Sequence, residues 1–512
     1  MADMINRLPQ GGRIDRDKPI RFTFNGRGYT GYAGDTLASA LLANDVRLVG
    51  RSFKYHRPRG ILSAGTEEPN ALVQLEEGAH TLPNVRATEI ELYEGLSASS
   101  QNCWPSVEFD VSAINSKLSR LFPAGFYYKT FMWPKALWMK YEEVIRNAAG
   151  LGKCPMEWDP SRYMHQHVYT DVLVVGAGPA GLSAALAAAR AGCEVMLIDE
   201  QASPGGDLST DAQTIDGKPG MEWVEAAINE LQANERVRVL PRTTVTGYFE
   251  HNYLIANERV TNHLGPKADT NIPRERLWKI RAREVVLATG SIERPLVFAD
   301  NDRPGVMLAG AVRRYINEYG VLPGKRLVIQ ANNDSAYGLA VDASKAGAEV
   351  TVIDTREAVS DAINALASEH GFKIRLNSAI TAVNYGKRIQ GVEVAEMNGM
   401  GDGLAGQPQR LTADLVATAG GWAPTLHLYS QAGGKLGYNE SIHGFLPRED
   451  QVLKPHARIA GSAGGEFALV DCLRAGHEAG AAAAEACGGK ATGDAPVADA
   501  DAQLVCTDQR PL

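Results

Sequence analysis

The stretch DVLVVGAGPAGLSAALAAARAGCEVMLIDE, residues 171–200, decides the fold. Its apolar start, Asp171 to Val175, is typical of a buried strand. The turn G-x-G-x-x-G from Gly176 to Gly181 then leads into a helix rich in small residues, and a second strand is expected from Glu194 to Ile198. This order of elements predicts a βαβ unit of the Rossmann type, with a dinucleotide at its glycine turn.

Each position of the turn has a predicted task. Gly176 makes the tight turn, Gly178 lets the backbone approach a pyrophosphate, and Gly181 allows close packing of helix and strand. Pro179 is a candidate residue within the same motif, and the N-terminal amides of the helix that follows are expected to face the phosphates.

Residues farther along the chain complete the predicted site. Asp199, 23 residues after Gly176, ends the second strand, where a carboxylate accepts hydrogen bonds from a ribose diol. No arginine stands beside it, which favours NAD or FAD over NADP. The other candidate residues are Glu200 and Gln201, which frame the adenosine, Gly206 in the loop 203–208, and Val245 near the end of a strand predicted over 237–247.

A second copy of the pattern lies at residues 325–356, KRLVIQANNDSAYGLAVDASKAGAEVTVIDTR. Its second strand ends in Asp354, again 23 residues after the start of the motif at Ala331. The three glycine positions hold Ala331, Asn333 and Ala336. Because Ala331 and Asn333 crowd the approach of a pyrophosphate, we expect a Rossmann fold whose nucleotide binding is lost or weakened.

The N-terminal region predicts a small β-grasp domain. Residues 20–34, IRFTFNGRGYTGYAG, alternate around Asn25-Gly26 as in a hairpin, and a helix capped by Asp35 is expected next. The stretch 50–73, GRSFKYHRPRGILSAGTEEPNALV, resembles the cluster loop of plant-type [2Fe–2S] domains, C-x4-C-x2-C. Those positions hold Ser63, Glu68 and Ala71, so we expect no cluster. The basic run of the loop contacts a phosphate or an acidic partner, or is a solvated structural loop; its members are Arg51, Lys54, His56, Arg57 and Arg59.

Composition narrows the class of protein. The 512 residues carry a net charge of −8, which gives no field for nucleic acid or anionic lipid. Six cysteines without a C-x-x-C pair argue against a zinc ribbon or a redox dithiol. The N-terminus has no apolar signal region and the chain has no long apolar run. We therefore expect a cytoplasmic protein without a membrane segment or bound metal.

We predict five parts of the chain. They are a ferredoxin-like β-grasp domain without a cluster, an aromatic-rich connector, an NAD-binding Rossmann domain built from two segments, a degenerate second Rossmann domain, and a tail. The connector either packs over its neighbours or forms a subunit interface. The boundaries are 1–110, 111–168, 169–295 with 426–490, 296–425, and 491–512.

Two nested Rossmann domains resemble the flavoproteins of the disulfide-reductase superfamily, over residues 169–490. That superfamily ends its flavin site with a strand and Gly-Asp, whose carboxylate contacts the flavin. Here Ala460 and Gly461 fit the pattern, but Ser462 replaces the acid. This departure weakens the case for FAD in the first site and favours NAD.

Nearly the whole chain resembles the α subunits of heterotetrameric sarcosine oxidases. The matching stretches are GYAGDTLASALLAN (31–44), VGRSFKYHRPRGILSAGTEEPNALV (49–73), GAGPAGLSAALAAARAG (176–192), QANNDSAYGLAVDASKAGAEVTVIDTR (330–356) and ATAGGWAPTLHL (417–428). In that family the complex oxidises sarcosine to glycine, with hydrogen peroxide and a one-carbon unit as the other products. The one-carbon unit leaves as formaldehyde or is captured by tetrahydrofolate.

The resemblance also implies cofactors and partners. It places NAD in the first Rossmann domain, lined by Ala180, Asp199, Glu200, Gln201, Asp207 and Val245. It places FMN at the interface with a β subunit, and FAD and sarcosine within that subunit, with γ and δ subunits completing the complex. No catalytic residue is expected in this chain. Family α subunits continue into a folate-binding domain, so we expect no folate site in these residues. The alternatives are a flavoprotein reductase using FAD and NADH, and a subunit of an amino-acid or opine dehydrogenase.

Overall fold

The computed structural model of the chain describes residues 4–121, 133–148, 150–398, 403–448, 457–490, 492–498 and 504. These residues form two compact units. Unit 1 comprises 1–160, 295–331 and 336–419, and unit 2 comprises 161–294, 332–335 and 420–512. Five aromatic residues that we assigned to the connector lie outside the described residues: Phe122, Phe126, Tyr127, Tyr128 and Phe131.

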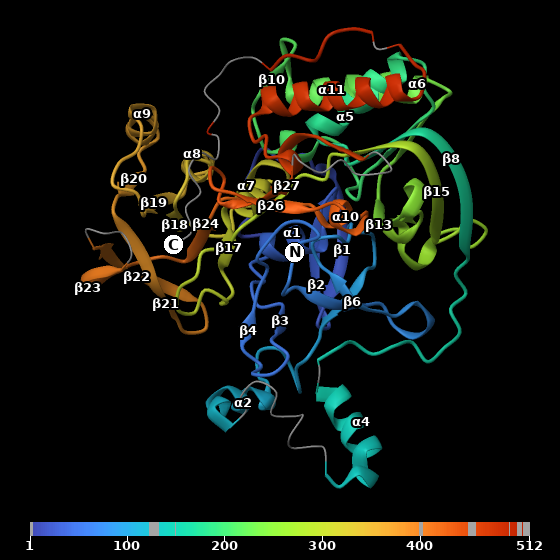
Figure 1. The fold of residues 1–512 in the computed structure, drawn as a ribbon. Coiled ribbons are helices and arrows are strands. Elements are labelled where there is room, and N and C mark those ends of the chain that lie inside the picture. Colours follow the sequence, from blue (N-terminus) through green and yellow to red (C-terminus); the bar gives the residue numbers. More distant parts are fainter. Residues whose placement is uncertain are drawn as a thin grey trace. The chain divides into compact units, whose positions relative to one another are not determined.

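Unit 2 is built on a sheet of seven strands in the order β12-β9-β8-β15-β14-β13, with β28 also paired to β15. The long strands β8 and β15 pair in parallel along their whole lengths (Figure 1). Only the second half of β8 is buried, because it alone runs beneath helix α5 in the apolar core. The elements that form the sheet and its cover are β8 (Tyr163–Val175), α5 (Pro179–Arg190), β9 (Val195–Ile198), α6 (Gly220–Ala233), β12 (Val237–Leu240), β13 (Thr243–Phe249), β14 (Tyr253–Arg259), β15 (Glu275–Leu287), β28 (Ala457–Ile459) and α11 (Leu469–Ala486).

Helix α11 packs on α5 at very short range, which explains its composition of alanine and glycine (Figure 1). A Cβ atom on Gly476 would lie 2.1 Å from the carbonyl oxygen of Ala180, and one on Gly480 would lie 2.2 Å from that of Ala184. Ser183 Oγ donates a hydrogen bond to the carbonyl of Leu473 across the same contact, at 2.8 Å. The C-terminal helix therefore fixes the start of α5, where the predicted site lies.

The remaining strands and helices of unit 2 are short. Strands β16 and β25 pair with each other, as do β26 with β27 and β10 with β11. They are β10 (Thr214–Ile215), β11 (Lys218–Pro219), β16 (Ser291–Glu293), β25 (Trp422–Pro424), α10 (His427–Gln431), β26 (Leu436–Asn439), β27 (Gly444–Pro447) and the 3-10 helices η5 (Gly206–Ser209), η6 (Glu250–Asn252), η7 (Asn262–Lys267) and η8 (Gly461–Gly464).

Unit 1 begins with a five-stranded sheet in the order β2-β1-β7-β5-β6, which holds the predicted hairpin. Our predicted cap of the first helix was wrong. Thr36, not Asp35, is the N-cap, in a capping box with Ser39, because the Asp35 carboxylate is turned inward to Ser39 Oγ and Arg7. The elements are β1 (Asp15–Phe24), β2 (Arg27–Ala33), α1 (Leu37–Ala43), β3 (Gly50–Arg51), β4 (Pro58–Arg59), β5 (Leu72–Leu75), η1 (Gly78–His80), β6 (Leu82–Arg86), β7 (Ser97–Ser100), η2 (Val111–Ala113), α2 (Ile114–Lys117), η3 (Ser119–Leu121), η4 (Lys135–Leu137) and α4 (Trp138–Ala148).

The second half of unit 1 holds a parallel sheet in the order β17-β24-β18-β19-β20 and an antiparallel sheet of β21, β22 and β23. The strands β18 and β19 and the helix between them follow the pattern of the predicted second copy. The elements are β17 (Val306–Leu308), α7 (Ala309–Asn317), β18 (Arg326–Ala331), α8 (Ala336–Lys345), β19 (Glu349–Asp354), α9 (Asp361–His370), β20 (Lys373–Arg375), β21 (Ser378–Tyr385), β22 (Ile389–Met397), β23 (Leu404–Leu411) and β24 (Leu415–Ala419).

Two further expectations about strands need correction. The single strand predicted over 237–247 is two strands, β12 and β13, because Arg242 takes a left-handed backbone conformation between them (φ 54°). Strand β8 starts at Tyr163, within the segment that we assigned to the connector. No helix among the described residues is long and apolar enough to span a membrane.

Candidate dinucleotide site

Two of the three motif glycines are required by the fold itself. Gly176 has φ +102°, and a Cβ atom there would lie 2.2 Å from the carbonyl oxygen of Ala288 on the neighbouring segment. A Cβ atom on Gly181 would lie 1.8 Å from the carbonyl oxygen of Gly176. Both contacts are with backbone atoms, so no side chain could move aside, and the close packing predicted for Gly181 is present.

Gly178 differs from the other two motif glycines, because no contact among the described residues requires a glycine there. Its φ is −73°, which any residue adopts, and it is the N-cap of α5 with Pro179 directly after it. In the part of the chain that the structure describes, a Cβ atom on Gly178 would meet no protein atom within 4 Å. The open side of Gly178 is therefore a place where the backbone can approach a ligand, at the positive end of the helix dipole.

The loop predicted to approach the phosphates lies against this turn. Gly205 donates a backbone hydrogen bond to the carbonyl of Ala177 at 2.9 Å. Gly206 has φ +55°, and a Cβ atom on it would lie 3.2 Å from the Cα atom of Gly178. Asp207 follows in η5 with its side chain exposed. The structure thus brings Gly206 to the glycine turn.

Asp199 lies at the end of β9 with its carboxylate directed at the same turn. Its Oδ2 atom accepts the backbone N–H of Ala177 at 2.5 Å, and Oδ1 accepts that of Gln201 at 2.7 Å. The backbone N–H of Thr243 donates to the carbonyl of Asp199 at 2.7 Å, which sets the start of β13 beside the acid. Val245 follows two residues later on β13.

Glu200 and Gln201 are held through their main chains. Arg259 donates to the carbonyl of Glu200 at 2.8 Å, and the backbone N–H of Arg242 donates to the carbonyl of Gln201 at 2.9 Å. The structure therefore places the acid, the residues after it and the β13 strand at one edge of the sheet, as the ribose and adenosine side of the site requires.

Ala460 and Gly461 also reach the start of α5. The backbone N–H of Ala460 donates to the carbonyl of Leu287 at 3.1 Å, which aligns this segment with the end of β15. Gly461 has φ +71°, and a Cβ atom on it would lie 2.7 Å from the Cβ atom of Ala180. The segment 460–461 and the glycine turn thus meet at the N-terminus of one helix.

Sequence reasoning missed Glu466, which lies just beyond η8. Among the described residues its Oε2 atom is buried without a hydrogen-bond partner. Burial raises the pKa of this carboxyl group. The thiol of Cys472 donates to the carbonyl oxygen of Glu466 at 3.0 Å, and burial, with the charges of Glu466 and Asp207, raises the pKa of that thiol to about 12. An acid four residues after Ser462 was the only available sequence signal, and no spacing rule assigns it a role.

The second motif is filled by its own side chains. Within unit 2, Asn333 is buried and its Oδ1 atom accepts from Ser335 Oγ at 2.6 Å, while Trp422 Nε1 donates to that hydroxyl at 3.3 Å. Within unit 1, the Asp354 carboxylate is buried and accepts from Tyr337 OH at 2.7 Å and from Arg356 at 2.8 Å. The turn and the acid that would hold a dinucleotide therefore already have partners.

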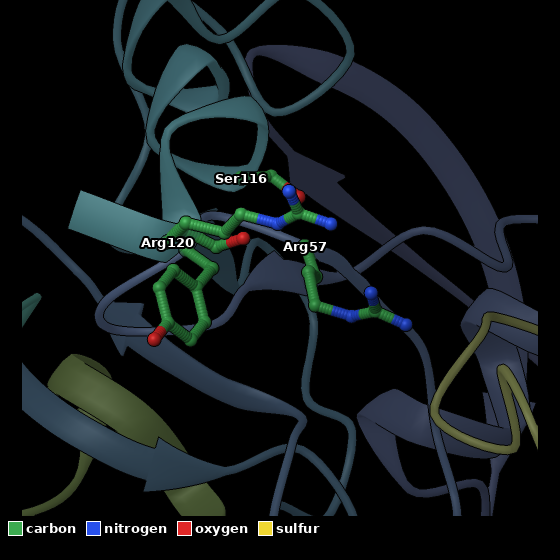
Figure 2. Close-up of a pocket in the computed structure, with 5 residues that line it drawn as sticks. Arg57, Ser116 and Arg120 are labelled. Atoms are coloured by element: carbon green, nitrogen blue, oxygen red, sulfur yellow. The ribbon is translucent and has the colours of Figure 1, made fainter. Parts of the chain in front are cut away.

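The basic run of the N-terminal domain has acidic partners within unit 1. Arg57 donates to both Asp302 and Asp300 at 2.7 Å, and Arg59 also pairs with Asp302. His56 Nδ1 lies 2.6 Å from the buried Asp110 carboxylate. A cavity of about 390 Å³ lies beside the run, lined by Tyr55, Arg57, Ser116, Ser119 and Arg120 (Figure 2). The ion pairs favour the structural interpretation of this run over a phosphate site.

Comparison with known proteins identifies the family. The family described as "Pyridine nucleotide-disulphide oxidoreductase" matches residues 170–443, more than half of the 512 residues. The chain belongs to this family. The match confirms the predicted Rossmann-type α/β fold and indicates an oxidoreductase domain of a kind that binds a flavin or a nucleotide. The crystal structure of L-proline dehydrogenase from P. horikoshii shows the same fold, with a TM-score of 0.61 and 21% identity over 95% of this chain and 77% of that one.

The chain is also similar to two curated proteins named sarcosine oxidase subunit alpha, which confirms the predicted resemblance. The protein from Rhizobium meliloti (strain 1021) is 48% identical over 92% of this chain and 46% of its own length. The protein from Corynebacterium sp. (strain P-1) is 42% identical over 93% of this chain and 44% of its own length. The chain thus spans less than half the length of these relatives.

A second family, described as "2Fe-2S iron-sulfur cluster binding domain", matches residues 17–103. This match agrees with the predicted ferredoxin-like β-grasp domain. The residues do not fit a cluster, however, because iron–sulfur clusters are held by cysteine thiolates. The positions of the cluster loop hold Ser63, Glu68 and Ala71, and the described residues contain no group of three or more His, Cys, Asp or Glu side chains that could hold a metal ion.

Proposed function

We propose that this chain is the α-type subunit of a multi-subunit sarcosine oxidase and that it binds NAD in its first Rossmann domain. The single observation that carries the NAD site is the open side of Gly178, at the start of α5 and beside Asp199. The similarity to proteins named sarcosine oxidase subunit alpha supports the assignment to such a complex. The site includes Gly176, Gly178, Pro179, Ala180, Gly181, Asp199, Glu200, Gln201, Gly206, Asp207, Val245, Ala460 and Gly461.

In this proposal the enzyme oxidises sarcosine at its C–N bond with oxygen as the acceptor. Sarcosine, oxygen and water give glycine, hydrogen peroxide and formaldehyde, or the one-carbon unit passes to tetrahydrofolate. FAD and sarcosine lie in a β subunit, FMN lies at the interface with it, and γ and δ subunits complete the assembly. No residue of this chain then acts on the amine.

The residues of this chain bind and orient the dinucleotide. The backbone amides at the start of α5 face its pyrophosphate, and Gly178 and Gly206 leave room for that approach. Asp199 accepts hydrogen bonds from the ribose hydroxyls in addition to those from the backbone, because each carboxylate oxygen can accept more than one. NAD supplies a nicotinamide ring that carries a hydride when bound.

The filled second motif supports one dinucleotide per chain. A reductase that uses FAD and NADH needs both Rossmann domains, and here the second turn is closed by Asn333, Ser335 and Trp422. The acid of that domain is likewise paired with Arg356. The asymmetry between the two motifs is therefore the physical basis for assigning NAD to the first domain alone.

Matched substitutions of the two equivalent acids test the site. Asp199→Asn removes the charged acceptor for the ribose diol, and since hydrogen bonds to charged groups are worth about 1.5–3 kcal/mol each, NAD affinity should fall at least tenfold. Asp354→Asn is the control, because it changes the same position of the second motif. It should leave the NAD content unchanged. Equal NAD loss in both variants, or in neither, would contradict the assignment.

A further inference from the structure

The loop that resembles an iron–sulfur cluster loop is organised around the carboxylate of Glu68. Its Oε2 atom accepts the backbone N–H groups of Leu62 at 2.8 Å and Ser63 at 2.7 Å. Its Oε1 atom accepts those of Asn70 at 2.7 Å and Ala71 at 3.0 Å. The Ser63 hydroxyl lies 3.3 Å from Oε2 and gives a fifth contact. Glu68 is 1% exposed, so the carboxylate that accepts these bonds is shielded from water.

The donors come from both sides of the loop and converge on one point. In a ferredoxin the same kind of loop wraps an anionic cluster, whose sulfur atoms accept hydrogen bonds. Here the middle cysteine position holds an acid whose side chain turns back to the loop that carries it. A carboxylate only accepts hydrogen bonds, so its two oxygens can pair with all four N–H groups. Leaving any of these N–H groups unpaired in a buried site would cost free energy.

The loop also joins two parts of unit 1. Tyr315 OH on α7 donates to the carbonyl of Ser63 at 2.9 Å, and the backbone N–H of Leu308 on β17 donates to that of Leu62 at 2.8 Å. On the side of the β-grasp sheet, Thr88 Oγ1 donates to the carbonyl of Gly65 at 2.7 Å. The backbone carbonyls therefore face outward to neighbouring elements while the N–H groups face inward to Glu68.

We propose that residues 62–71 form an anion cradle whose resident anion is the side chain of Glu68, and that this cradle orders the joint between the β-grasp sheet and the segment 306–315. The site takes a carboxylate where the related domains take an iron–sulfur cluster. The N-terminal domain is on this basis a structural module without a redox centre. The proposal concerns unit 1 alone and does not depend on NAD in unit 2.

Chemical rescue in the full-length chain tests the cradle. Glu68→Ala removes the carboxylate and leaves the four N–H groups around a small space. Amide hydrogen exchange at Leu62, Ser63, Asn70 and Ala71 should become at least tenfold faster, and the melting temperature should fall. Formate or acetate should restore slow exchange and part of the melting temperature, whereas chloride at equal ionic strength should restore less, because its single centre cannot satisfy two pairs of donors.

Two further variants keep the test decisive if Glu68→Ala does not fold. Glu67→Ala is the matched control, since it removes the neighbouring acid and should leave exchange in the loop unchanged. Glu68→Gln keeps the shape but turns an amide NH₂ towards two N–H donors, so it should speed exchange at one pair of amides. Unchanged exchange in Glu68→Gln, or equal rescue of Glu68→Ala by chloride and formate, would overturn the proposal. So would uptake of a [2Fe–2S] cluster by the wild-type chain supplied with iron and sulfide.

Discussion

Adding one methyl group at Gly178 or at Gly181 distinguishes a residue that faces the nucleotide from a residue that the fold requires. For Gly181→Ala, the new Cβ atom would lie 1.8 Å from the Gly176 carbonyl oxygen, so the strand and helix must separate. Overpacking of this kind costs about 1–3 kcal/mol or more. The variant should unfold at a clearly lower temperature and lose its nucleotide together with the fold.

Gly178→Ala should leave the fold intact, because its Cβ atom would meet no atom of the described residues within 4 Å and the φ of −73° suits alanine. Alanine restricts the backbone of the unfolded chain more than glycine does, which raises the free energy of unfolding by about 0.4–1 kcal/mol. Replacing glycine by alanine at an N-cap costs a similar amount, so the net change should be under about 1 kcal/mol. The methyl group nevertheless occupies the side where the pyrophosphate approaches, and we expect at least tenfold weaker binding, or about 1.4 kcal/mol.

The assay compares thermal unfolding and nucleotide released per chain in the wild type and both variants. A wild-type melting temperature with little nucleotide in Gly178→Ala, together with a clearly lower melting temperature in Gly181→Ala, would support the site. Full nucleotide content in Gly178→Ala would show that the open side of Gly178 does not face the ligand. A fall in melting temperature for Gly178→Ala as large as that for Gly181→Ala would also refute the reasoning.

Three further predictions follow from contacts elsewhere in the units. Burial alone would raise the pKa of Asp302, but Arg57 and Arg59 outweigh it and hold the value at about 2. Because this pKa is lowered on folding, the stabilisation is present above about pH 4 and is lost as the pH falls towards 2; it should amount to about 1 kcal/mol after solvent screening. Acid unfolding of Asp302→Asn should lack this step, and an unchanged acid profile would rule the ion pairs out as its source. Gly476→Ala should separate α11 from α5 and lower both the melting temperature and the NAD content, since its Cβ atom would lie 2.1 Å from the Ala180 carbonyl oxygen. Gly28→Ala serves as the comparison for an added methyl group alone, because its φ is not positive and its Cβ atom would meet no described atom within 4 Å; an equal effect on NAD content would argue against the helix contact. Ser335→Ala removes a hydroxyl that fills the second turn. Because the buried Asn333 and the paired Asp354 remain, the variant should still hold one nucleotide per chain, and a second equivalent in the wild-type chain would disprove the closed second site.

Much of the first site could be predicted from sequence because its residues follow one another along a single βαβ unit. The spacing from Gly176 to Asp199 fixes the turn, the helix and the acid together, and the structure brings them together. Gly206 was reachable for the same reason, since its loop follows the second strand directly. The glycine turn is predictable because its backbone geometry admits few residues other than glycine.

Other features depend on contacts between distant segments and could not be found in this way. Asp35 and Thr36 are both good N-caps, and only the burial of Asp35 beside Arg7 decides between them. Glu466 Oε2 is buried without a hydrogen-bond partner among the described residues because η8 packs against α11, a contact that no sequence spacing encodes. Loss of the cluster cysteines was visible at Ser63, Glu68 and Ala71. That Glu68 turns inward to four backbone donors was not, because the sequence does not show the direction of a side chain.

The most direct test of an NAD-binding α-type subunit is the nucleotide content of the purified chain, measured alone and after co-expression with a candidate β subunit. Nucleotides released by denaturation are separated by chromatography and compared with the absorbance spectrum of the intact protein. We predict close to one NAD and no flavin in the chain alone, with flavin present only in the complex. Stoichiometric FAD in the isolated chain, together with oxidation of NADH, would contradict this assignment.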